Sequence, residues 1–144
     1  MAKAILYSFI CSAILFVQSC GTGMSSQRGS LEKEVLAMHD ELMIKTEDLI
    51  KLRKELAKAR LKTKGKGKRD QAKDVIVLIN AAESFMEDWM RFYGNNKPEE
   101  KDDDEKAITF YTEQVLELVR MQEQMQDAEK EAKELLETMK GSND

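Results

Sequence analysis

Residues 70–93 read DQAKDVIVLINAAESFMEDWMRFY, and this stretch decides the fold. Its apolar residues recur at spacings of three and four, the repeat that places side chains on one face of an α-helix. This face consists of Ala72, Val75, Ile79, Ala82, Met86, Trp89 and Tyr93. A second row, seven residues apart, widens it at Leu78, Phe85 and Phe92. We therefore expect residues 70–93 to form the most buried helix of an all-α protein, with Asp70 as its N-cap.

Two further helices are predicted on either side of this stretch. Residues 31–63 carry a heptad repeat in which Lys45 stands where one apolar side chain is expected. The apolar positions of this helix are Leu31, Val35, Met38, Leu42, Leu49, Leu52, Leu56 and Ala59. Residues 99–140 form the third helix, and its apolar face changes phase after Leu118. That face is Ile108, Tyr111, Val115, Leu118, Met125, Ala132, Leu135 and Met139.

Short connections join the three predicted helices. The first connection, at residues 64–69, is a basic turn that contains two glycines, and the second is polar. Because short connections make neighbouring helices antiparallel, residues 31–140 are predicted to form an up-down-up three-helix bundle, followed by a disordered tail at 141–144. A dimeric or domain-swapped coiled coil is the alternative, since sequence periodicity does not report oligomeric state.

The start of the chain has the features of a bacterial lipoprotein signal peptide at residues 1–19. A lysine precedes an apolar run at residues 4–17, and a small residue stands directly before Cys20. Cleavage there would leave Cys20 to carry lipid, with residues 20–30 as a flexible Gly/Ser-rich tether. We expect the anchor in the outer membrane, on its periplasmic face. An uncleaved anchor is the alternative, although a spanning helix needs roughly 20 apolar residues.

Aromatic residues gather at one end of the predicted bundle. Up-down-up topology brings together the start of the first helix, the end of the second and the start of the third. The candidate interaction surface at this end is His39, Phe85, Trp89, Phe92, Tyr93 and Phe110, and Tyr111 lies beside it. These side chains could close the end of the core, or Trp89 or Phe92 could anchor a partner. We expect Phe92 to be the more exposed of the two, because it lies off the main apolar face.

No catalytic constellation appears in the sequence. The chain has one histidine, and removal of the signal peptide would take Cys11 and leave only the lipid-bearing cysteine. No serine stands in a turn beside a base, and no glycine-rich phosphate loop follows a strand. The mild net charge of −4 argues against general nucleic-acid binding. We therefore predict a protein that is not an enzyme and holds no cofactor.

The methionines permit a second interpretation. Met86 with Met90, and Met121 with Met125, stand four residues apart, so that each pair shares a helix face. Thioethers together with His39 could take up Cu(I). Methionine is also a common filler of helical cores, and we favour that role, so no metal site is predicted.

Two short motifs carry a resemblance to a known family. Residues 38–43 (MHDELM) and 88–90 (DWM) resemble the recurring motifs of small Bacteroidota lipoproteins, which are sometimes named "viral A-type inclusion protein" for their coiled-coil similarity. The resemblance covers the signal peptide and much of the remaining chain, but members often have a proline where this chain has Ile44. It implies a helical lipoprotein of the cell envelope with no established function, and it transfers no site residues.

These features together predict a non-enzymatic, lipid-anchored scaffold or interaction protein of the cell envelope. Its expected partners are the membrane, an envelope protein and a second copy of the chain, but not nucleic acid. The alternative is a periplasmic chaperone-like or soft-metal-binding helical protein, although the LTxxQ motif of small helical chaperones is absent. Exposure of Trp89, Met90 and Phe92 distinguishes a binding surface from a closed core.

Overall fold

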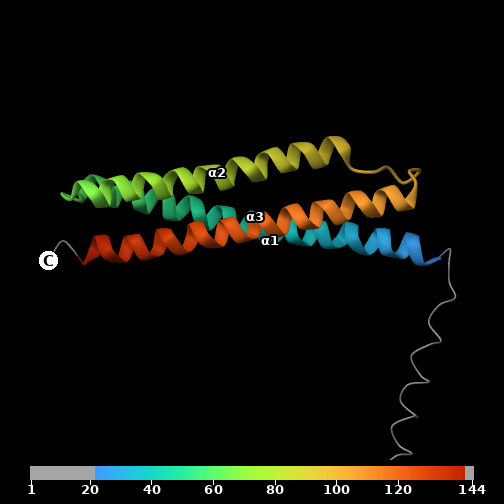
Figure 1. The fold of residues 1–144 in the computed structure, drawn as a ribbon, viewed down its shortest axis with the longest axis horizontal. Helices are drawn as coiled ribbons and strands as arrows, with labels where there is room; N and C mark the ends of the chain where they lie inside the picture. Colours follow the sequence, from blue (N-terminus) through green and yellow to red (C-terminus); the bar gives the residue numbers. More distant parts are fainter. Residues whose placement is uncertain (1–21, 142–144) are drawn as a thin grey trace, which may run out of the picture.

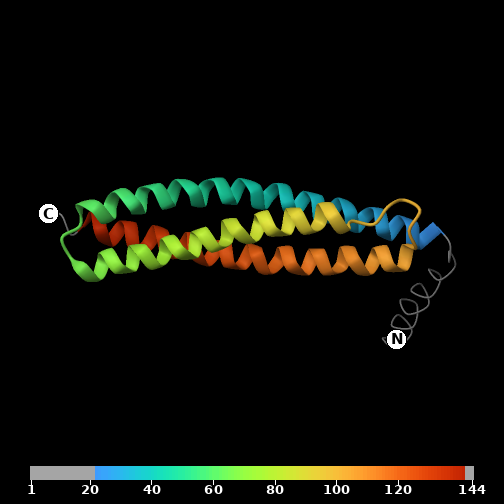
Figure 2. The same cartoon turned by 90° about the horizontal axis from the view of Figure 1, so that it is seen from above.

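The computed structural model describes residues 22–141 and shows an antiparallel three-helix bundle (Figure 1, Figure 2). Helix α1 spans Thr22–Lys62, α2 spans Lys66–Asn96 and α3 spans Asp104–Lys140. Helices α1 and α3 run in one direction, and α2 runs back beside them. The predicted all-α, up-down-up fold is therefore confirmed.

Three predicted features lie outside the described residues. They are the signal peptide at 1–19, the lipidation site Cys20 and the tail beyond Gly141. Among the helices that the structure does describe, none is both long enough and apolar enough to cross a bilayer.

The core is organised around heptad positions of α1. Val35, Leu42, Leu49 and Leu56 recur every seven residues and are almost completely buried. Residues between them, such as Leu52, pack against the same core and are partly buried. Such a repeat keeps one seam of a helix facing its neighbours along the whole bundle. In α2, the main face predicted from the sequence is confirmed, because all seven of its residues are buried. The expectation that α2 is the most buried helix is wrong, since its second row, Leu78, Phe85 and Phe92, is about half exposed and α3 has more buried residues.

The predicted apolar face of α3 is wrong at three positions, Ile108, Val115 and Leu135, which are only partly buried. The side chains buried in their place are Ala107, Gln114 and Leu136. The prediction gives weight to large apolar residues, whereas the core accepts the small Ala107 and the polar Gln114. Leu135 and Leu136 are the same residue type, so their order of burial could not be predicted from size or polarity.

The predicted phase shift in α3 is also wrong. Met121 is buried, so the buried row runs from Leu118 through Met121 to Met125 at spacings of three and four. Once Gln114 is included, the repeat is continuous from Tyr111 onward. One heptad seam therefore extends through the middle of α3 without interruption.

Helix α1 begins at Thr22 rather than Leu31, so the predicted flexible tether is wrong over the residues that the structure describes. Glycine and serine have low helix propensity, but Arg28 fixes this segment through contacts far along the chain. Its guanidinium donates to the carbonyl oxygens of Glu99 at 2.7 Å and Asp102 at 3.1 Å. It also pairs with the carboxylate of Asp104 at 3.1 Å. These contacts tie the start of α1 to the α2–α3 connection.

Helix α2 begins at Lys66 rather than Asp70, so Asp70 is not its N-cap. The N-cap is Gly65, which makes no side-chain hydrogen bond to the helix. Three basic residues of the predicted turn, Lys66, Lys68 and Arg69, thus become helical. Lys68 donates from Nζ to the carbonyl oxygen of Thr138 at 2.7 Å. A cation at this position stabilises the C-terminal end of α3, where the last backbone carbonyl groups carry the negative end of the helix dipole.

Helix α3 begins at Asp104, later than the predicted residue 99, because Asp103 caps it. The carboxylate of Asp103 accepts hydrogen bonds from the backbone N–H groups of Glu105 at 3.0 Å and Lys106 at 3.1 Å. The predicted acidic first turn is present, and its charge complements the positive end of the helix dipole.

Candidate functional site

The structure brings most of the predicted surface residues together at one end of the bundle. At this aromatic end, which lies on the right in Figure 1, α1 begins and the α2–α3 connection crosses. The ring centroid of Trp89 lies 5.6 Å from the ring centroid of His39 and 5.0 Å from that of Tyr93. Phe110 continues the cluster, with centroids 6.0 Å from Tyr93 and 6.3 Å from Phe92. All three helices therefore contribute rings to one stacked cluster.

Exposure divides the aromatic side chains into two groups. Trp89 is only 8% exposed, and Tyr93 and Tyr111 are buried with it. Phe85 is 54% exposed and Phe92 is 50% exposed. The expectation that Phe92 is more exposed than Trp89 is confirmed. The buried rings close the end of the core, whereas the two phenylalanines leave apolar surface uncovered beside them.

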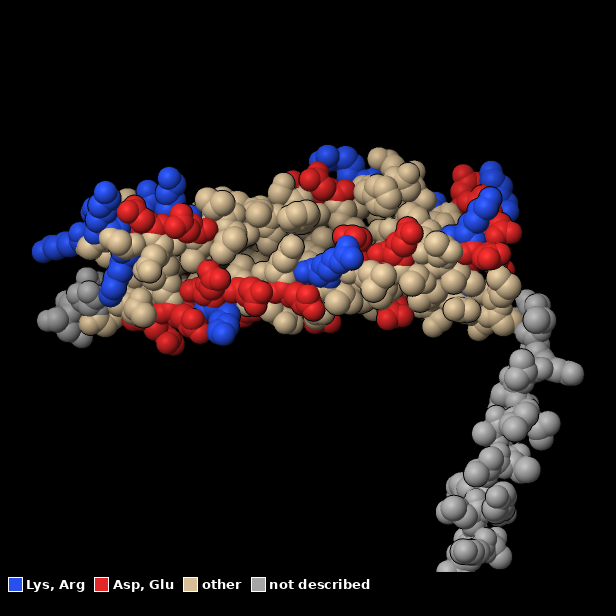
Figure 3. Space-filling model, in the orientation of Figure 1, with Lys and Arg blue, Asp and Glu red and all other residues tan. Residues whose placement is uncertain are grey.

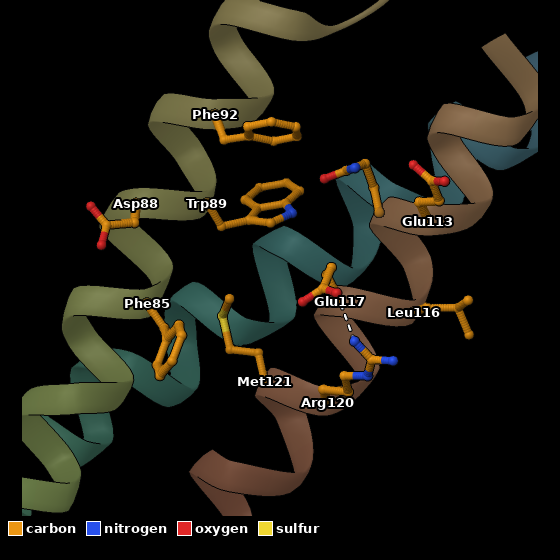
Figure 4. Close-up of a pocket in the computed structure, with 10 residues that line it drawn as sticks. Phe85, Asp88, Trp89, Phe92, Glu113, Leu116, Glu117, Arg120 and Met121 are labelled. Carbon is orange, nitrogen blue, oxygen red and sulfur yellow. Dashed lines mark hydrogen bonds and ion pairs between the residues drawn. The ribbon is translucent and has the colours of Figure 1, made fainter. Parts of the chain in front are cut away.

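A groove of about 620 Å³ opens between α2 and α3 beside Trp89 (Figure 4). Phe85, Trp89 and Phe92 project from α2 toward α3, and Met121 lies across from them. The other lining residues are Asp88, Glu113, Gln114, Leu116, Glu117 and Arg120. We call this hollow the α2–α3 groove. Its size falls in the range of sites that hold a ligand or an anchoring side chain.

Two polar atoms at the groove have no hydrogen-bond partner among the described protein atoms, Nε1 of Trp89 and Oε1 of Gln114. Gln114 is 3% exposed, so both side chains are more than nine-tenths buried. In Figure 4 the indole nitrogen of Trp89 faces α3 across the groove. An unpaired buried polar group costs about 1–3 kcal/mol. An acceptor at Nε1 of Trp89 and a donor at Oε1 of Gln114 would satisfy the two atoms.

The hydroxyl of Tyr93 is also buried without a hydrogen-bond partner among residues 22–141. Burial, together with the nearby Tyr111 and Glu32, raises the pKa of Tyr93 to about 12. Burial likewise raises the pKa of Tyr111, with Glu32 again adding to the effect. Both phenols are therefore neutral at physiological pH, and the aromatic end keeps an uncharged interior.

Charged side chains surround the mouth of the groove. Asp88 pairs with Arg91 at 3.2 Å and Glu117 pairs with Arg120 at 2.8 Å, each within one helix and largely exposed. Such surface pairs contribute little to stability and can exchange partners. Glu113 forms no ion pair with any described side chain. The mouth therefore carries a surplus of negative charge.

The two methionine pairs noted in the sequence differ in burial. Met86, Met121 and Met125 are buried in the core, whereas Met90 is exposed. His39 directs Nδ1 to a carboxylate oxygen of Asp40 at 3.2 Å. Residues 22–141 also contain no group of three or more His, Cys, Asp or Glu placed to hold a metal ion.

Comparisons of this chain with protein-family models, with curated proteins and with solved structures find no match. Its function is therefore argued from the geometry of the groove.

Sequence reasoning missed Gln114 and the groove itself. Gln114 stands three residues after Tyr111 and four before Leu118, so continuation of the heptad could have placed it in the core. The groove depends on how far α2 lies from α3, which the packing of many side chains decides. Phe85 was predicted as part of the surface, and it lines the groove without joining the stacked rings.

Proposed function

We propose that this protein is a non-enzymatic, lipid-anchored interaction module of the cell envelope. In this proposal, the α2–α3 groove receives part of a partner protein. The apolar run before Cys20 and the resemblance to small Bacteroidota lipoproteins support the anchor and an outer-membrane, periplasm-facing location. Helix α1 begins two residues after Cys20, so a lipid at Cys20 would hold the aromatic end beside the bilayer.

One observation carries the proposed interaction. The half-exposed rings of Phe85 and Phe92 stand beside a buried donor at Trp89 and a buried acceptor at Gln114, and neither has a hydrogen-bond partner within residues 22–141. Exposed aromatic side chains around a desolvated polar pair are typical of the centre of a protein–protein interface. In a protein that binds nothing there, the same arrangement would only lower stability and solubility.

Native complex size tests the interaction. We expect the protein in detergent-solubilised envelopes to migrate in an assembly larger than a single chain. Replacing both Phe85 and Phe92 with aspartate should shift it to the monomer, because charges then occupy the apolar walls. Ile44→Asp is the matched control, since Ile44 is 65% exposed on α1 and does not line the groove. A complex that survives the double change would contradict the proposal.

Intact mass and membrane fractionation test the anchor. The native chain should begin at Cys20 and carry the added mass of acyl chains, and it should sediment with the membrane. A Cys20→Ala variant should remain unprocessed or be released. Native protein that is soluble with an unmodified Cys20 would contradict the anchor but would leave the groove to be tested separately.

A further inference from the structure

An exposed apolar row extends the groove along α2. Leu78, Phe85 and Phe92 stand seven residues apart, and Leu78 is 46% exposed, much like the two phenylalanines. Fourteen residues of helix span about 21 Å. Positions beside the core of a self-sufficient bundle are usually polar. A heptad row of half-exposed apolar side chains is instead the surface against which a further helix packs.

The α2–α3 side of the bundle is acidic beyond the groove. A second hollow of about 440 Å³ lies farther along the same two helices, and no Lys or Arg lines it. Its carboxylates, Asp74, Glu131 and Glu134, form no ion pair with any described side chain. Figure 3 shows acidic side chains gathered over α3. With Glu113 at the groove mouth, this side complements a cationic occupant.

The buried polar pair limits the occupant further. An occupying helix satisfies its own backbone amides, so a side chain must reach Nε1 of Trp89 and Oε1 of Gln114. A carboxamide of Asn or Gln supplies an acceptor and a donor together, and a Ser or Thr hydroxyl does the same. One polar side chain within an apolar seam fixes the register of a helix pair.

From these three features we infer that the occupant is an amphipathic α-helix of a partner protein. It presents an apolar heptad row to α2, Lys or Arg to the acidic flanks and one Asn, Gln, Ser or Thr to the buried pair. This inference rests on the proposed function and names its partner class. An anionic membrane surface is disfavoured because it would meet carboxylates. A second copy is disfavoured because a two-fold contact would bring the acidic sides together.

A display selection tests the chemistry of the occupant. The library consists of 18-residue helices that are randomised at the flanking positions and at one central seam position. The full chain serves as bait, and the double variant of Phe85 and Phe92 to aspartate removes clones that bind elsewhere. We expect Lys and Arg to be enriched at the flanks and Asn, Gln, Ser or Thr at the centre.

Fluorescence then measures the affinity of a selected peptide that lacks tryptophan. Trp89 is the only tryptophan of the chain, so its emission reports directly on the groove. Gln114→Met should weaken binding about fivefold to tenfold, the effect of one lost hydrogen bond. Gln122→Met is the matched control, because Gln122 bonds to Glu41 away from the groove. Added salt should also weaken binding, since the flanks pair charges.

Four results would overturn the inference. In the selection, they are enrichment of acidic or non-helical sequences, or enrichment that is the same with the Phe85 and Phe92 double variant as bait. The other two are a change in Trp89 emission when anionic phospholipid vesicles are added, and a dimer in sedimentation that the double variant dissociates. If one of them occurs while groove variants still lose the native envelope complex, the partner class is wrong and the proposed function stands. If the groove variants form a native complex of unchanged size, the proposed function itself is wrong.

Discussion

Replacing Gln114 with methionine should stabilise the free protein while weakening its binding. Gln114 is 3% exposed and its Oε1 has no hydrogen-bond partner among the described protein atoms. Removing such an acceptor relieves about 1–3 kcal/mol. Methionine has a similar length, and repacking a volume-conserving change costs less than about 1.5 kcal/mol. We therefore expect a net gain of about 1 kcal/mol in the free energy of unfolding.

Urea and thermal denaturation of residues 22–144 would measure this gain. A gain of 1 kcal/mol corresponds to a rise of about 3 to 5 °C in Tm for a bundle of this size. The control is Gln122→Met, which removes an exposed hydrogen bond to Glu41 and should change stability by less than about 0.5 kcal/mol. A loss of stability in Gln114→Met would refute the reasoning, because it would mean that the carboxamide is satisfied in the free protein.

Three further predictions concern the bundle and its aromatic end. Leu49→Ala should lower the free energy of unfolding by about 2–5 kcal/mol, because Leu49 is almost fully buried, whereas Ile44→Ala should have little effect in the same denaturation experiment. Arg28→Ala should speed amide hydrogen exchange in residues 22–30 without changing exchange in the core, and unchanged rates would show that this segment is helical for another reason. The pKa of Tyr93 is raised to about 12, so the contribution of the neutral phenol to the free energy of unfolding is complete below pH 10 and is lost as pH rises toward 12. Tyr93→Phe should therefore reduce the fall in the free energy of unfolding between pH 10 and 12, as measured by denaturation. Phenolate absorbance should show Tyr93 titrating above pH 10.

The sequence predicted the main face of α2 well, but it predicted the second row of α2 and the ends of the helices poorly. The buried face of α2 could be predicted because an apolar residue, small or large, occupies every position of the repeat from Ala72 to Tyr93. The start of α1 could not, since it depends on bonds from Arg28 to residues more than seventy positions away. Local propensity assigns the Gly- and Ser-rich residues 22–30 to a tether, and these long-range contacts override it.

The candidate site was predictable in its residues but not in its shape. Topology alone brings His39, Trp89 and Phe110 to one end, and the structure places them there. The division of exposed Phe92 from buried Trp89 followed from their positions relative to the main face. The burial of Gln114 was not predicted, because polar residues are not counted when an apolar repeat is read from a sequence. A buried polar residue of this kind is the feature that separates a binding groove from a plain bundle end.

Photo-crosslinking in native envelopes tests the central claim most directly. A photoreactive amino acid would replace Phe92 at the groove or Val77, which is 56% exposed on the same helix but does not line the groove. The account predicts a discrete adduct of one partner protein from position 92 and none from position 77. Equal adducts from both positions, or none from position 92 while the protein remains membrane-bound, would contradict it.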